Sequence, residues 1–162
     1  MEIQYLKNLE NTSKVEYSSQ MIEGISEEKI AEYETQLGII FPLAYKEFLY
    51  LAGSYPGYLV LLDGLASIED LADEEYQAYR QKAYLEPFNF KETRPYWTFA
   101  TGSQAFWFFY LDEDTEDPIV WQAELYDVGS YDLNHAGKKQ TFSEFINDIV
   151  DYSKEYYKEM YG

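Results

Sequence analysis

Apolar residues recur with the period of an α-helix early in the chain. Ile30, Tyr33 and Leu37 fall on one helix face. Ser26 precedes them, where its hydroxyl can cap free backbone N–H groups, and Gly38 follows them, where a helix commonly ends. We therefore predict a helix of about three turns between Ser26 and Gly38.

A second helix is predicted to begin at Pro42 and to end at Gly53, because proline suits the first turn of a helix and glycine its end. Its apolar face consists of Tyr45, Phe48, Leu49 and Ala52. Between the two helices, residues 39–41 are predicted to be extended.

The third predicted helix begins at Ser67, which forms a variant capping box with Asp70, and it ends no later than Pro87. Its apolar face consists of Leu71, Ala72, Tyr76, Tyr79 and Ala83. Asp70, Asp73 and Glu74 lie on the opposite face, so we expect them to be displayed to solvent.

Four apolar runs predict short β-strands, at residues 58–62, 96–100, 105–111 and 119–125. The third run is continuously apolar, which is typical of a strand in the interior of a sheet. The acidic segment 112–118 joins it to the fourth run, so we expect an antiparallel hairpin with an acidic tip.

The last helix is predicted to begin at Thr141, which forms a capping box with Glu144. Its inner face consists of Phe142, Phe145, Ile146, Ile149 and Ser153. This order of elements indicates an α+β fold, with N-terminal and C-terminal helices packed on a central, mostly antiparallel twisted sheet. Since no repeat or linker divides the chain, we expect residues 1–162 to form one domain.

Negative charge is concentrated in two segments that contain no basic residue, within a formal net charge of −18. The first, between Lys46 and Arg80, contains Glu47, Asp63, Glu69, Asp70, Asp73, Glu74 and Glu75. The second, between Arg94 and Lys138, contains Asp112, Glu113, Asp114, Glu116, Asp117, Glu124, Asp127 and Asp132. Either these acids form solvated faces that keep the protein soluble, or both segments form one negative surface for a basic partner. The same charge disfavours direct binding to nucleic acid or to an anionic membrane.

The sequence contains no motif of a catalytic or metal site. The absence of cysteine excludes disulfides and sulfur-ligated metals, and no glycine-rich phosphate loop or nucleophile elbow occurs. His135 is the only histidine and lies in a predicted loop. The alternating acids from Asp112 do not form a calcium loop, because Asp117 stands where glycine is required and Ala123 where a glutamate is required. We therefore expect no enzyme activity, cofactor or metal; a carboxylate-based hydrolase or calcium-dependent enzyme is the least favoured alternative.

Two further features concern location. The N-terminal residues lack the basic and apolar regions of a secretory signal, and the longest uncharged stretches, 48–62 and 95–111, fall short of a membrane span. We expect a cytoplasmic protein. The sequence does not determine the oligomeric state, and a monomer is the simplest expectation.

Residues 24–53 resemble the N-terminal signature of the SUKH superfamily. They contain Leu37-Gly38 at the end of one helix, an extended segment, and a second helix opened by Phe41-Pro42. Later parts of the chain are similar to the superfamily's following helix start, central hairpin and C-terminal helix, at 65–71, 117–120 and 141–146. The resemblance spans residues 24–151 and leaves 1–23 as an N-terminal extension.

The resemblance implies an immunity protein (SMI/KNR type) of a bacterial polymorphic or contact-dependent toxin system, which neutralises its cognate toxin by binding it. We expect a basic toxin domain such as a nuclease, because a protein that holds phosphates must carry Lys and Arg, which an acidic partner complements. The alternative is a regulatory or scaffold interaction module of the same fold without a toxin partner. The residues expected to contact the partner are Asp70, Asp73, Glu74, Asp112, Glu113, Asp114, Glu116 and Asp117.

Overall fold

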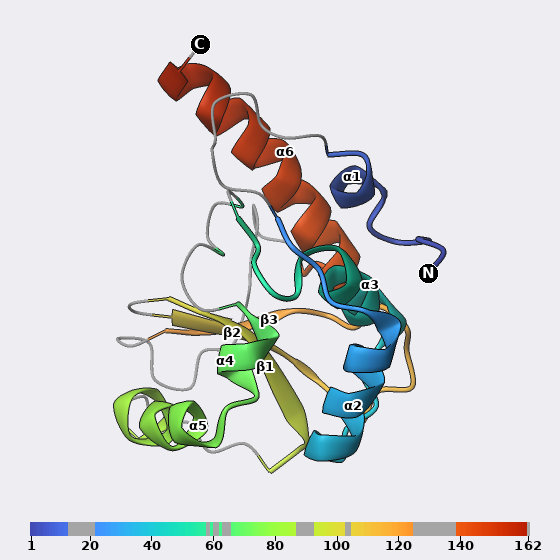
Figure 1. Ribbon diagram of the computed structural model, residues 1–162. Coiled ribbons are helices and arrows are strands. Elements are labelled where there is room, and N and C mark those ends of the chain that lie inside the picture. The colour runs from blue at the N-terminus through green and yellow to red at the C-terminus, as the bar shows by residue number, and fades with distance from the viewer. Residues whose placement is uncertain are drawn as a thin grey trace.

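The computed structural model describes residues 1–12, 22–57, 59, 62, 66–86, 93–102, 105–124 and 139–161 (Figure 1). Its helices are α1 (Lys7–Glu10), α2 (Glu27–Leu37), α3 (Leu43–Ala52), α4 (Ile68–Leu71), α5 (Glu74–Arg80), the π-helical η1 (Gln81–Leu85) and α6 (Phe142–Tyr161). Its strands are β1 (Tyr96–Thr101), β2 (Ala105–Tyr110) and β3 (Trp121–Glu124). Helices around a three-stranded antiparallel sheet confirm the predicted α+β class.

The sheet has the strand order β1-β2-β3, and both neighbouring pairs are antiparallel. The predicted hairpin is therefore confirmed, with the continuously apolar β2 in the centre. β3 is shorter than the predicted strand, because Ile119 forms only an isolated bridge with Thr141. The register of β1 against β2 shifts between Thr98 and Ala100, which places an irregularity in an edge strand.

The two faces of the sheet carry separate apolar clusters. Phe109 of β2 belongs to the larger cluster with α3 and α6, whereas its neighbours Phe108 and Tyr110 belong to a smaller cluster that includes Leu85 of η1. Alternate residues of a strand point to opposite faces, so both faces of the sheet are apolar. Figure 1 shows α3 and α6 on one side of the sheet and α5 on the other.

Tyr45 of α3 lies at the centre of the larger cluster. It is fully buried, and its ring contacts those of Phe41, Phe48, Trp97, Phe109 and Phe142. The Trp97 indole N–H donates a hydrogen bond to the Tyr45 hydroxyl at 2.9 Å, which gives both buried polar groups a partner. Burial raises the pKa of Tyr45, so this hydroxyl stays protonated.

Local capping signals are confirmed at both ends of the fold. The Ser26 hydroxyl accepts a hydrogen bond from the Lys29 N–H at 3.2 Å, and Gly38 ends α2 with a φ of 66°, a conformation that favours glycine. At the start of α6, the Glu144 N–H donates to the Thr141 hydroxyl at 3.4 Å, and the Thr141 N–H donates back to the Glu144 carboxylate at 3.3 Å.

The single helix predicted from Ser67 is wrong. Ser67 makes no side-chain cap, α4 ends at Leu71, and α5 begins after Asp73. The Asp73 carboxylate accepts the Tyr76 N–H at 3.0 Å, so a local side-chain bond starts a new helix where the prediction had an uninterrupted one. Of the predicted apolar face beyond this break, Tyr76 packs against the larger core cluster, whereas Tyr79 is 58% exposed.

The strand predicted at 58–62 is also wrong for the residues of it that the structure describes. Leu59 and Leu62 are buried but belong to no strand. The Leu59 N–H donates to the Pro56 carbonyl at 3.2 Å, and the Leu62 N–H donates to the Leu59 carbonyl at 3.1 Å. Three-residue spacings of this kind are turns, which satisfy the backbone locally.

The N-terminal segment packs into the core. Leu6 and Leu9 are buried, and the Glu47 carboxylate of α3 accepts the three consecutive backbone N–H groups of residues 4–6 at 2.9–3.1 Å. Glu47 is itself fully buried. It counts toward the first acidic segment of the sequence, but it adds no charge to the surface.

Candidate functional site

The acids expected to contact a partner lie at the two ends of β1. The acidic loop, residues 112–117, follows Leu111, whose N–H donates to the Pro95 carbonyl at 2.9 Å just before β1 begins. At the other end, the Tyr76 hydroxyl of α5 shares a hydrogen bond with the Thr101 hydroxyl at 2.7 Å. A strand of this length spans about 20 Å. The acidic loop and the acids of α4 and α5 are thus separate groups on the molecule (Figure 1).

Arg94 orders the first half of the acidic loop. Its guanidinium donates to both carboxylate oxygens of Asp112, at 2.7 and 3.0 Å, approaches Glu113 at 3.4 Å, and stacks 3.7 Å from the centre of the Tyr110 ring. Hydrogen bonding from Arg94 holds the pKa of Asp112 below its ordinary value, and the same bond raises the pKa of Arg94. The Arg94–Asp112 pair neutralises part of the negative charge of the acidic loop. It also holds the Asp112 carboxylate in a fixed position.

The second half of the acidic loop is anchored to three other parts of the chain, which are α6, the N-terminal segment and α3. The Asp117 carboxylate accepts the backbone N–H and the hydroxyl of Ser143, at 2.8 and 2.6 Å, in the first turn of α6. The Glu116 carboxylate accepts the Tyr5 hydroxyl at 2.7 Å, which raises the pKa of Tyr5. The Glu116 carbonyl accepts the Ala44 N–H at 2.9 Å at the start of α3. Asp117 is therefore a structural residue, and Glu116 serves the fold as well as the surface.

An exposed apolar side chain lies beside the acidic loop. Ile40 is 84% exposed, more than any other large apolar residue that the structure describes. It borders a hollow of about 330 Å³, the Ile40 hollow, together with Phe41, Pro42 and residues 111–115. Three carboxylates, those of Asp112, Glu113 and Asp114, border the same hollow. This combination brings an apolar contact and negative charge into one place.

Ile40 is not among the residues that we expected from the sequence to contact a partner, although the pattern of its neighbours indicates its exposure. In an extended segment, neighbouring side chains point to opposite sides, and Ile39 and Phe41 point inward. The backbone is held in this course by the Glu34 carboxylate, which accepts the Phe41 N–H at 2.8 Å. Ile40 must then point toward solvent.

The acids of α4 and α5 have two different roles. Asp70 and Glu74 are exposed, as predicted. Asp73 is also exposed, but it caps α5. A substitution there would change the helix as well as the surface charge.

His135, Asp63, Asp127 and Asp132 lie outside the residues that the structure describes. Among the residues it does describe, no three acidic or histidine side chains come close enough together to hold a metal ion. In the same part of the chain, no helix has the length and apolar character needed to cross a membrane.

Comparison with known protein families gives a match that covers α2, α3 and the three strands of the sheet. The family model for the SMI1 / KNR4 family (SUKH-1) matches residues 24–148, which is most of the chain and includes the acidic loop and Ile40. A search of curated proteins gives no match. The match confirms the SUKH resemblance that the α2–α3 signature carries, and with it a family of the immunity-protein type. This chain belongs to the SMI1 / KNR4 family (SUKH-1).

Proposed function

We propose that this protein is a non-catalytic immunity protein that binds a basic toxin domain, with a nuclease as the best-fitting class, and blocks its active site or its path for substrate. The observation that carries the proposal is the exposed Ile40 beside the carboxylates of the acidic loop. Protein interfaces combine a buried apolar anchor with a polar rim that complements the partner's charge. Membership of a family of the immunity-protein type supports the same class of function.

Ile40 and the acids contribute at different stages of binding. Burying an isoleucine side chain against a partner contributes about 1.5–3 kcal/mol, so Ile40 slows dissociation. The acids act before contact, because a net charge of −18 attracts a basic nuclease and speeds encounter by about 10- to 1,000-fold at low salt. Asp114, Asp70 and Glu74 are the exposed acids with the clearest steering role.

The Arg94–Asp112 pair gives the interface part of its specificity. Because Asp112 is already bound on both oxygens, it is ordered before a partner arrives, and fewer side chains lose freedom on binding. A toxin lysine or arginine would then be directed to Asp114 and Glu113. Binding of this kind takes place in the cytoplasm of the cell that must be protected.

The test is co-expression of this chain with a toxin domain encoded beside it. We expect growth to be restored and the two proteins to form a stable complex. Ile40→Ser should weaken binding by about ten- to a hundredfold, because the apolar anchor is lost. The matched control is Met160→Ser on α6, where the residue is 59% exposed and the affinity should not change.

Failure to bind the toxin and to restore growth would contradict the proposal. Stable binding to a chromosomally encoded protein in a strain that lacks any toxin would instead favour the regulatory or scaffold module. Equal affinities for Ile40→Ser and the unmodified chain would place the interface elsewhere on the molecule.

A further inference from the structure

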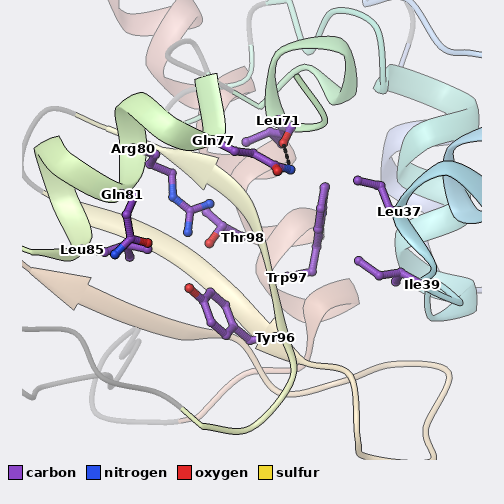
Figure 2. Close-up of a pocket in the computed structure, with 10 residues that line it drawn as sticks. All are labelled: Leu37, Ile39, Leu71, Gln77, Arg80, Gln81, Leu85, Tyr96, Trp97 and Thr98. Atoms are coloured by element: carbon purple, nitrogen blue, oxygen red, sulfur yellow. Dashed lines mark hydrogen bonds between the residues drawn. The ribbon is translucent and has the colours of Figure 1, made fainter. Parts of the chain in front are cut away.

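A second concave site lies at the outer edge of β1, and apart from Ile39, the neighbour of Ile40, its lining comes from other parts of the chain than the Ile40 hollow. This Arg80 pocket has a volume of about 330 Å³ and lies between the end of α2, α4, the continuous α5–η1 helix and β1 (Figure 2). Its polar lining includes Arg80, Gln81, Tyr96 and Thr98, and its apolar wall includes Leu37 and Trp97. Small-molecule sites have this mixture of a largely apolar wall and a few polar groups, and the volume is at the small end of their range.

Arg80 is a largely buried cation in this pocket. Its guanidinium lies over the Phe106 ring, 5.5 Å from the centre, and points toward Thr98 and Tyr96 in Figure 2. Burial lowers the pKa of Arg80, while Tyr96 and Tyr76 favour its charged form. Among the residues that the structure describes, no carboxylate forms an ion pair with it. A buried charge without a counterion is costly, and it is uncommon unless a ligand completes the site.

Two buried polar atoms of the pocket have no hydrogen-bond partner. One is the Nε of Arg80 and the other is the hydroxyl of Thr98. Thr98 is buried, with a relative exposure of 2%. An N–H donor and a hydroxyl donor on neighbouring elements can converge on one acceptor. Buried groups of this kind in native proteins generally have a partner, so their coincidence in one concave site indicates a ligand.

The backbone around the pocket is irregular on both sides. Gln81 and Leu85 belong to η1, a π-helical turn that continues α5, and the register of β1 shifts just after Thr98. π-Helical turns and β-bulges are uncommon and occur frequently next to functional sites, where they redirect side chains. Here they flank the two residues whose polar atoms are unpartnered.

We propose that the Arg80 pocket binds a small organic monocarboxylate with an apolar body. The planar guanidinium matches a carboxylate, and the Thr98 hydroxyl supplies a further donor. Among the lining residues that the structure describes, Arg80 is the only cation, so it can balance one negative charge; a phosphate dianion would need a second cation. Leu37, Leu71 and Trp97 would pack against the apolar part of the ligand. This site is independent of the proposed binding of a toxin.

The experiment is an NMR titration of the full chain with benzoate and hexanoate, and with benzamide and hexanamide as neutral analogues. Trp97 lines the site, and its indole N–H donates to Tyr45, so the signal of this ring reports on the pocket, while those of Trp107 and Trp121 serve as internal controls. We expect saturable shifts of the Trp97 signal with the acids and at least about tenfold weaker binding of the amides.

Three variants identify the groups involved. Arg80→Met should weaken binding of the acids by about ten- to a hundredfold and should raise the melting temperature, because a charge that burial disfavours is removed. Thr98→Val should weaken binding less. Lys82→Met removes an exposed cation from η1 and should leave the affinity unchanged.

Several results would overturn the proposal. They are the absence of a saturable response to either acid, equal binding of acids and amides, or unchanged affinity in a folded Arg80→Met variant that keeps its three indole signals. A C-terminally amidated peptide containing one aspartate tests the other source of a carboxylate. If this peptide binds and the free acids do not, the pocket is a docking site for a protein side chain rather than for a small ligand.

Discussion

Ser143 donates its backbone N–H and its hydroxyl to the carboxylate of Asp117, at 2.8 and 2.6 Å, across 26 residues of sequence. Ser143 lies in the first turn of α6, where backbone N–H groups have no partner within the helix and the dipole favours a negative charge. An acid from the acidic loop therefore caps the C-terminal helix. The same bond fixes the hairpin against α6.

Replacing Asp117 by alanine should lower the free energy of unfolding by about 1–2 kcal/mol, the usual contribution of a helix cap. The matched control is Asp114→Ala, in the same loop but exposed, which should change stability by less than about 0.5 kcal/mol. Urea unfolding followed by circular dichroism measures both. Equal stabilities of the two variants would show that the Asp117–Ser143 bond does not support the fold.

Glu47→Gln should loosen the N-terminal segment, because one carboxylate satisfies the N–H groups of residues 4–6 and an amide offers only one oxygen to them. We expect a loss of about 1–3 kcal/mol in the free energy of unfolding, together with faster hydrogen exchange at these amides. Glu32→Gln, at an exposed position of α2, is the control and should leave exchange unchanged. Unchanged protection of residues 4–6 in Glu47→Gln would contradict this role.

The pKa of Asp112 should lie below that of an ordinary aspartate and should rise in Arg94→Met, because the Arg94 hydrogen bond stabilises the charged form. A pKa lowered in the folded state means that the pair stabilises the fold above the unfolded value of about 4 and ceases to do so as the pH falls through the lower folded value. A carbon-13 titration of the carboxyl groups between pH 2 and about 6 covers this range. The exposed pair should contribute little to stability, so the titration and not the melting temperature is the measurement. An Asp112 pKa that is the same with and without Arg94 would contradict the assignment.

Neutralising the exposed acids should slow binding of the toxin without harming the fold. Asp70→Asn, Glu74→Gln and Asp114→Asn together should lower the association rate and flatten its dependence on salt, since these groups act over distance. The control combines Glu2→Gln and Glu10→Gln in the N-terminal segment. Stopped-flow association at several salt concentrations is the measurement. If the control slows association equally, the steering charge is not localised in the two acidic groups.

The elements that could be predicted are those whose signals involve residues a few positions apart. Ser26 and Gly38 bound α2, and Thr141 with Glu144 starts α6, because caps use backbone groups within one turn of the residue. The division between α4 and α5 is also local, because the Asp73 carboxylate accepts the Tyr76 N–H, but the predicted helix from Ser67 ran through Asp73 and missed this cap. Leu59 and Leu62, in the run predicted as a strand, are buried but form no strand, since apolar character predicts burial better than backbone conformation.

The sequence by itself determined the α+β class, both ends of α2 and α3, the start of α6, the central position of β2 and the excess of negative charge. The tertiary structure decided which acids remain available to a partner. Glu47 binds the N-terminal segment, Asp117 binds α6 and Asp112 binds Arg94, and each of these partners lies 18 or more residues away. In the unfolded chain the carboxylates of Glu47, Asp117 and Asp112 all carry the same charge. Only the fold determines whether water, an arginine or a backbone N–H group contacts each of them. The exposure of Ile40 and the burial of the Arg80 Nε are likewise properties of packing between distant segments, which periodicity along the chain does not show.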